Sequence, residues 1–587
     1  MILAALPLAS YALDPNWPYG SPAMTDTWLY LGAAAQPEFW ATHVSNVYWW
    51  TRYAWTLPGI ALFKMLDPVA ANLAWHALFV YGAAVAVFLW ARPLAGPAVA
   101  LIGVATLVLD RWVQVSLGWH YVDGAGAAYL LAASACVTAG ARSRRSSLLL
   151  LGGAFAGLTT NLNPVAAPLA PCVALPPIVY HGWRRARDAG GVAKELALCT
   201  MGAALTWAVL AGVHFAWTGS IDIATPNIEI ARFVQVNGAL QLPSLSEKLW
   251  RYGTDAQYRW LDLDIMPVLL VTALTLADLA RRQRPSELAI LASGGGALAL
   301  LLAAVYEVTG RTAIYYMMHF TYWQPFATLA IAALAEHTVR QGVRAPLLAA
   351  GIVAAALLVM LIDVVQGDWL GSAVQHRCAD SLQNTCLQEG SAVLPLVGSV
   401  ATWALGAVWL WLAVRRGRAR SSRHGTLLAA SLALAISAGL LVRGDVSRRL
   451  GWRAPWQDRQ DAQHHLLAVV QAGAWVRGVF PEGVVGFAFQ DRLSDRFLDT
   501  LSLPIGTSFG AHRWYLTDHL PEITCPDGPP RPIERQVVIM GPDPSIRAVG
   551  EAALARCGLA LRPVAEMGLT SGRFRYYLFA FRGERPG

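Results

Sequence analysis

Residues 123–159 read DGAGAAYLLAASACVTAGARSRRSSLLLLGGAFAGLT, and this stretch decides the fold. Two apolar runs flank a short basic turn that carries Arg142, Arg144 and Arg145. An apolar run of roughly 20 residues is long enough to cross a bilayer core as a helix. The stretch therefore predicts a pair of membrane-spanning helices joined by a basic turn.

The same alternation continues along the chain, because arginine clusters occupy every second gap between apolar runs. The clusters are Arg92; Arg142, Arg144 and Arg145; Arg184, Arg185, Arg187 and Lys194; Arg281, Arg282 and Arg284; Arg340 and Arg344; and Arg415, Arg416, Arg418, Arg420 and Arg423. Inserted helices keep their positive loops on the cytoplasmic side. The remaining loops are therefore predicted to face outward, together with any chemistry that they carry.

The composition supports a polytopic helical membrane protein. The chain is 56% hydrophobic and 14% charged, whereas about 25% of the residues of a typical soluble domain are charged. Its net charge of +8 is accounted for by cytoplasmic loops and a basic C-terminal region. No nucleic-acid partner is predicted.

We predict about thirteen membrane spans, at roughly 20 residues each. They fall near 1–13, 69–91, 97–110, 123–141, 146–159, 165–181, 195–217, 263–280, 286–309, 313–335, 345–366, 394–414 and 425–442. Two long loops, about 14–68 and 218–262, then face outward, and the N-terminus is cytoplasmic.

The sequence divides into a membrane domain, 1–442, and a C-terminal domain, 443–587, predicted to be periplasmic. Asp458–Val476 has helical spacing, and Val484–Phe489, Gln536–Met540 and Tyr576–Phe581 are typical of strands. A small α/β domain follows from this pattern. The predicted topology places Arg443 and the arginines after it on the outer side, contrary to the positive-inside bias. Charges that lead into a long translocated domain influence topology less than charges in short loops.

The cysteines support an oxidising compartment on the outer side. Cys136, Cys172 and Cys199 lie in apolar spans as packing residues. The other four form two outward pairs, and disulfides are predicted for them with free thiols as the alternative: Cys378 with Cys386 and Cys525 with Cys557.

The first outward loop is the segment richest in candidate chemistry. Residues 13–32, LDPNWPYGSPAMTDTWLYLG, place Asp14 and Asp26 among aromatic side chains. Aromatic rings stack on sugars, and a carboxylate can take a hydroxyl proton. The alternative is an interfacial aromatic belt with solvated carboxylates.

A second cluster lies at the outer edge of two spans, in DRWVQVSLGWHYVDG at 110–124. Ionisable residues at membrane depth usually face a cavity or the interior of a bundle. Asp123 opens a helix, where a carboxylate either caps the N-terminus or acts in catalysis. His120 is either a structural histidine of the interface or part of the site.

Basic residues on the outer side could hold a phosphate group. Arg311 stands with Tyr315 in GRTAIYYMMHFTYWQP, residues 310–325, while Arg52 and Lys64 belong to the first loop. A guanidinium matches phosphate oxygens in a fork. The same residues could instead be snorkelling anchors.

Three stretches carry a resemblance to a known group of enzymes: TDTWLYLG at 25–32, TRYAWTLPGIALF at 51–63 and GWHYVDGAGAAYLLA at 118–132. The chain resembles the GT-C superfamily of polyprenyl-phosphate-dependent membrane glycosyltransferases. Within it, dolichyl-phosphate-mannose or aminoarabinose-transferase-like bacterial proteins are the most similar. The resemblance covers mainly residues 1–335 and implies a bacterial inner-membrane protein.

The resemblance also implies roles for individual residues. Asp26 aligns best with the catalytic acid of the first loop, with Asp14 as the alternative, and Asp123 takes the second acidic position. The residues implied to contact the carrier phosphate or the substrate are Arg52, His120, Tyr121, Arg311, Tyr315 and Lys64. The adjacent acidic pair and the His-Pro-Pro sequence of many members are missing here, which leaves the identity of the base open.

The function implied is transfer of a sugar from a polyprenyl-phosphate carrier to an extracytoplasmic acceptor hydroxyl, with inversion. The partners are a lipid-linked sugar donor, a glycan, lipid or protein acceptor, and membrane lipids. No cofactor is predicted; a divalent ion between a carboxylate and the phosphate, as the resemblance implies for some relatives, is the less favoured alternative because the acidic residues here are widely spaced. The alternatives are a transporter or flippase, which should show paired halves with broken helices, and a non-catalytic scaffold with the same fold.

Overall fold

The computed structural model divides the chain into two compact units. The helical unit comprises residues 1–18, 76–212 and 222–455, and the mixed unit comprises 19–75, 213–221 and 456–587. The residues that the structure describes are 2–14, 25–35, 37–43, 45, 47–118, 122–185, 189–229, 246, 259, 261–308, 321–370, 393–415, 422–449, 456–481, 486–489, 513–515, 536–556, 558–572 and 574–584.

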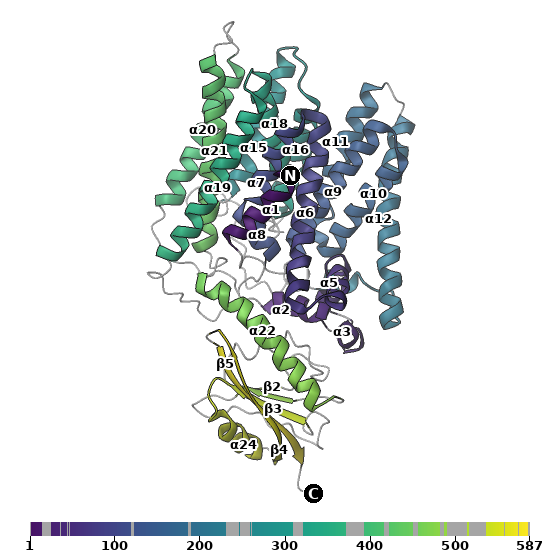
Figure 1. Cartoon of the computed structure of the whole chain (residues 1–587). Coiled ribbons are helices and arrows are strands. Elements are labelled where there is room, and N and C mark those ends of the chain that lie inside the picture. The colour runs from purple at the N-terminus through teal and green to yellow at the C-terminus, as the bar shows by residue number, and fades with distance from the viewer. Residues whose placement is uncertain are drawn as a thin grey trace. The chain divides into compact units, whose positions relative to one another are not determined.

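Helices that run side by side build the helical unit (Figure 1). They are α1 (Ile2–Leu13), α6 (Pro68–Ala95), whose first residues belong to the mixed unit, α7 (Pro97–Val108), α8 (Arg111–Gly118), α9 (Val122–Ser143), α10 (Ser146–Leu162), α11 (Leu169–Arg184), α12 (Ala189–Thr218), α15 (Asp262–Ala280), α16 (Glu287–Val308), α18 (Gln324–Arg340), α19 (Ala345–Leu370), α20 (Val393–Val414) and α21 (Ser422–Arg449).

Every predicted span overlaps one of these helices. Within the described ranges, eight helices are long and apolar enough to cross a membrane, and α1, α7 and α10 are apolar but shorter. The prediction of a mainly helical, polytopic chain is confirmed. Which face of the membrane each loop occupies stays a prediction.

Small residues let neighbouring helices approach closely. A Cβ atom on Gly153 of α10 would lie 1.9 Å from the Cys199 carbonyl oxygen of α12, and one on Gly202 of α12 would lie 2.0 Å from the Leu150 carbonyl oxygen. Close backbone contact at small residues is the usual way in which membrane helices associate. Cys172 and Cys199 are buried among the spans, as predicted, and Cys136 is half-buried.

The mixed unit combines helices of the first outward loop with the C-terminal region. The loop contributes α2 (Thr25–Ala35), α3 (Pro37–His43), α4 (Tyr48–Thr51) and α5 (Tyr53–Met65). The C-terminal region contributes α22 (Trp456–Val479), β1 (Gly486–Phe489), β2 (Arg513–Tyr515), β3 (Gln536–Gly541), α24 (Ile546–Arg556), β4 (Ala560–Ser571) and β5 (Phe574–Glu584). The predicted α/β character of this region is confirmed.

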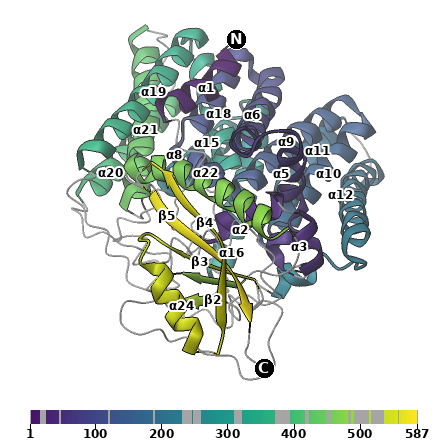
Figure 2. The same ribbon diagram turned by 60° about the horizontal axis from the view of Figure 1, so that its bottom comes forward.

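The five strands form one sheet in the order β2-β1-β3-β5-β4 (Figure 2). β1 is parallel to β2 and β3, while β5 is antiparallel to β3 and β4. Alternate residues of β3 point to opposite faces: Val538 packs with Ala472 and Val476 of α22, and Val537 packs with Leu554 of α24. The two helices therefore cover opposite faces of the sheet.

One further cluster connects the two parts of the mixed unit. Leu466 of α22 packs with Leu31 of α2, and both side chains are buried. Phe63 of α5, Leu73 of α6 and Val470 of α22 surround this pair. The described chain therefore groups the first loop with the C-terminal region, whereas the sequence analysis placed a boundary between 442 and 443, a position inside α21.

Candidate functional site

A buried arginine joins two carboxylates in the helical unit. Arg443 of α21 donates through Nη1 to Asp110 Oδ2, and its Nη2 lies 2.5 Å from Asp264 Oδ1. The second oxygen of Asp110 accepts a hydrogen bond of 2.9 Å from the Trp112 backbone N–H, which caps the start of α8. Asp264 lies in the first turn of α15, where the helix dipole favours a carboxylate.

A second buried ion pair connects α1 with α8. Asp14 directly follows α1, and its Oδ2 lies 3.2 Å from Arg111 Nη1. The same nitrogen donates to Gln114, and the Gln114 amide donates to Ser10 of α1 and, at 3.0 Å, to the Val108 carbonyl. Asp14 is therefore engaged by a guanidinium, and whether it also serves in catalysis stays a prediction.

Asp123 is completely buried at the start of α9. Its Oδ1 accepts a hydrogen bond of 3.2 Å from Asn163 Nδ2, at the end of α10. A Cβ atom on Gly126, one turn further, would lie 2.1 Å from the Tyr322 ring. The carboxylate thus sits at a tightly packed helix start, which is compatible with both capping and catalysis.

In the mixed unit, Arg52 is buried between two tyrosines. Its Nη1 donates to Tyr30 Oη of α2, and its Cζ lies 4.7 Å from the centre of the Tyr48 ring. A guanidinium against an aromatic face gains cation–π stabilisation. The expected basic residue is therefore held in a fixed position rather than snorkelling to a surface.

Next to Arg52 in the chain, Tyr53 forms a second polar contact in the mixed unit. Its hydroxyl oxygen lies 2.6 Å from His214 Nδ1, in the last turns of α12. Burial raises the pKa of Tyr53 above its ordinary value of about 10, so the phenol keeps its proton. Trp50 and Trp217 pack against this pair, with ring centres 5.2 Å apart.

Asp26 belongs to α2, the helix that also carries Tyr30. Residues four positions apart lie on the same face of an α-helix, one turn from each other. Position 26 therefore shares a helix face with the tyrosine that receives the Arg52 hydrogen bond. The Asp26 side chain itself lies outside the described residues.

Lys64 differs from Arg52 in its surroundings. It forms an ion pair of 3.2 Å with Glu38, and both side chains are more than half exposed. Exposed pairs of this kind contribute about 0–1 kcal/mol to stability. Lys64 is therefore a surface residue of α5, while Arg52 is buried.

Several predicted residues lie outside the described part of the chain, namely His120, Tyr121, Arg311 and Tyr315, together with the four cysteines of the two predicted disulfides. No group of three or more His, Cys, Asp or Glu residues that could hold a metal ion occurs among the residues that the structure does describe. Both the phosphate-binding role of Arg311 and the disulfides stay predictions.

The partnership of Asp264 and Arg443 has no direct signature in the sequence. Arg443 Nη2 lies 2.5 Å from Asp264 Oδ1, but the two residues belong to helices α21 and α15, which are far apart in the chain. The available signal was the presence of charges at the ends of apolar runs, which are costly there unless paired. The apolar pattern predicts Arg443 just after the last span, whereas Arg443 lies within α21 and is buried.

Comparison with known proteins gives a limited result. No protein-family model and no curated protein matches the chain. It is similar to ArnT from Cupriavidus metallidurans bound to undecaprenyl phosphate, with 14% identity and a TM-score of 0.43, and to apo ArnT, with 13% identity and a TM-score of 0.45. Both alignments cover 99% of this chain and 97% of the other. At these TM-scores the likeness assigns neither a family nor residue roles.

Proposed function

We propose that this chain is a membrane glycosyltransferase that moves a sugar from a polyprenyl-phosphate carrier to an extracytoplasmic acceptor hydroxyl, with inversion. One observation carries the proposal: the buried Arg52 guanidinium is bound by Tyr30, one turn from Asp26 on the same helix. A base and a phosphate ligand for one head group would thus come from a single small group of helices. The sequence resemblance favours the same two residues.

In the proposed reaction, Asp26 accepts the proton of the acceptor hydroxyl. The hydroxyl oxygen forms a bond to the anomeric carbon from the face opposite the phosphate, and the bond between that carbon and the phosphate oxygen breaks. The carrier leaves as a polyprenyl phosphate. Arg52 stabilises the charge that develops on it, and a fixed cation in a poorly hydrated site stabilises such charge strongly.

Asp26→Asn tests the proposal directly. The purified full chain in lipid nanodiscs is given synthetic polyprenyl phosphates that carry a hexose, a pentose or an aminopentose, together with a mixture of glycan and lipid acceptors. We expect release of polyprenyl phosphate from one donor, and a loss of about 100-fold or more in the variant, since a positioned general base contributes roughly 100- to 10,000-fold. Glu38→Gln, an exposed carboxylate of the same loop, is the matched control and should keep full activity.

Two results contradict the proposal. Undiminished release of polyprenyl phosphate by the Asp26→Asn variant would show that another residue is the general base. Transbilayer movement of an intact labelled donor, with no release of polyprenyl phosphate from any donor, would identify a flippase instead.

A further inference from the structure

Two neighbouring helix turns present a cluster of exposed arginines at one end of the helical unit. Arg142, Arg144 and Arg145 belong to the turn between α9 and α10, and Arg184 lies at the end of α11. All four are exposed, and none of them forms an ion pair with any residue that the structure describes. Exposed positive charge is therefore concentrated there, with Glu287 as a nearby carboxylate on which Arg142 and Arg184 act electrostatically.

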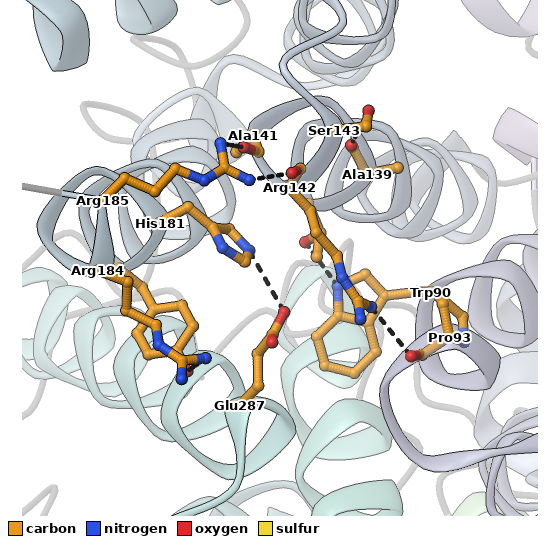
Figure 3. Close-up of polar contacts among 12 residues, drawn as sticks. Trp90, Pro93, Ala139, Ala141, Arg142, Ser143, His181, Arg184, Arg185 and Glu287 are labelled. Carbon is orange, nitrogen blue, oxygen red and sulfur yellow. Dashed lines mark hydrogen bonds and ion pairs between the residues drawn. The ribbon is translucent and has the colours of Figure 1, made fainter. Parts of the chain in front are cut away.

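Hydrogen bonds to backbone carbonyls hold the two turns together, as Figure 3 shows. Arg185 donates a hydrogen bond of 2.9 Å to the Ala141 carbonyl and another to the Arg142 carbonyl. Arg142 in turn donates a hydrogen bond of 2.9 Å to the Pro93 carbonyl at the end of α6. The guanidinium groups thus donate hydrogen bonds to carbonyl oxygens near helix C-termini. A hydrogen bond to a neutral carbonyl leaves the positive charge of the guanidinium unchanged.

The carboxylate of this region has a different partner. Glu287 Oε1, at the start of α16, lies 3.3 Å from His181 Nε2 of α11, as the dashed line in Figure 3 shows. Its side chain is 19% exposed. Because this single carboxylate stands beside four exposed arginines, the surface formed by the two turns keeps a positive excess.

An exposed aromatic residue borders the arginines. Trp183 is 79% exposed, immediately before Arg184 and after a helix with exposed apolar residues such as Val179. Tryptophan is enriched at the boundary between lipid tails and headgroups. Arginines beside such a residue lie at the level of lipid phosphates when the helices span a bilayer.

We propose that the turns at 142–145 and 183–185 form a binding site for the phosphate group of an anionic phospholipid in the adjoining leaflet. Basic pockets between transmembrane helices on the cytoplasmic side are suited to such headgroups. A guanidinium matches phosphate oxygens bidentately. Trp183 would pack against the upper part of the acyl chains.

Two other basic turns among the described residues of the helical unit lack this arrangement. At the end of α18, Arg340 is paired with Glu336 at 2.6 Å. Between α15 and α16, Arg282 and Arg284 are exposed, and Arg282 has a positive φ of 56°, as Arg144 has one of 61°. This turn therefore resembles the turn at 142–145 in charge and backbone conformation. The hydrogen bond that connects it to another helix runs from Arg281 to the Val414 carbonyl.

The experiment compares two double variants of the full chain, Arg144→Gln/Arg145→Gln and Arg282→Gln/Arg284→Gln. Each purified protein is reconstituted in phosphatidylcholine nanodiscs with increasing phosphatidylglycerol, and retained phosphatidylglycerol is counted by native mass spectrometry. We expect the first variant to bind it roughly 30-fold more weakly, about 2 kcal/mol, since a direct hydrogen bond to a charged group such as a phosphate contributes about 1.5–3 kcal/mol. The second variant should bind like the unmodified chain.

Equal losses in the two variants would overturn the site, because they would indicate diffuse attraction of any basic turn. If inorganic phosphate at the concentration of the phosphatidylglycerol displaced that lipid from the protein, the choice of a lipid ligand would be overturned. Trp183→Ala gives an independent measurement: it should weaken retention of phosphatidylglycerol but leave the response to inorganic phosphate unchanged. These measurements involve no sugar transfer, so their failure is separate from a failure of the proposed enzyme.

Discussion

The helical unit handles charge in opposite ways at its two ends. At one end, Asp110, Asp264 and Arg443 are buried together, as are Asp14 and Arg111. At the other end, arginines such as Arg144 and Arg145 are exposed on turns between helices. Burying an ion away from water is unfavourable unless a partner of opposite charge compensates it.

The difference identifies which charges hold the fold and which remain available to ligands. Buried pairs connect helices that are distant in the chain, so removing one member leaves its partner isolated at low dielectric. Exposed arginines keep their hydration and can be changed with little effect on stability. Three substitutions test this contrast, from the largest expected effect to the smallest.

Arg443→Gln should have the largest effect on stability. It removes the positive charge between Asp110 and Asp264, and breaking a buried pair typically costs on the order of 3–5 kcal/mol. We expect a strongly lowered thermal midpoint of the detergent-solubilised protein, measured as loss of the monodisperse peak after heating. A midpoint equal to that of the unmodified protein would mean that the two carboxylates are hydrated.

Asp14→Asn should have an intermediate effect. Arg111 loses its carboxylate but keeps its hydrogen bond to Gln114, and a poorly satisfied buried group costs about 1–3 kcal/mol. We expect a moderately lowered midpoint with release of polyprenyl phosphate retained by the folded fraction. An unchanged midpoint together with lost release would instead make Asp14 the catalytic base.

Arg144→Gln should have the smallest effect on stability. The side chain is exposed and lies on a turn, and substitutions of this kind usually change stability by no more than about 0.5 kcal/mol. The same heating assay should give the midpoint of the unmodified protein. A shift as large as that of Asp14→Asn would remove the proposed distinction between the two ends.

Apolar length and basic turns predicted the helices well, because both signals are local. The run at 123–141 became α9, and the run at 345–366 became most of α19. In the C-terminal region, β3 and β5 followed from β-branched and aromatic residues, whereas β4 was missed. Most residues of β4 are exposed on an edge strand, so its sequence lacks a buried face.

The candidate site was less predictable, because its contacts join distant segments. Asp14 belongs to the first outward loop and Arg111 to the second cluster at 110–124, and nothing in their spacing indicates that they pair. Tyr30 and Tyr48 both lie in the first outward loop, and their contacts with Arg52 depend on how α2 and α4 pack. Tertiary contact of this kind leaves no periodic pattern in a single sequence.

The packing of Leu31 against Leu466 has a consequence for biosynthesis. Translation delivers the N-terminal part of a chain first, at about 5–20 residues per second. The helix that carries Asp26 therefore emerges long before α22, and the Leu31 side chain lacks its Leu466 partner until α22 has been made. A truncated product without α22 would leave this apolar surface of the proposed base's helix exposed.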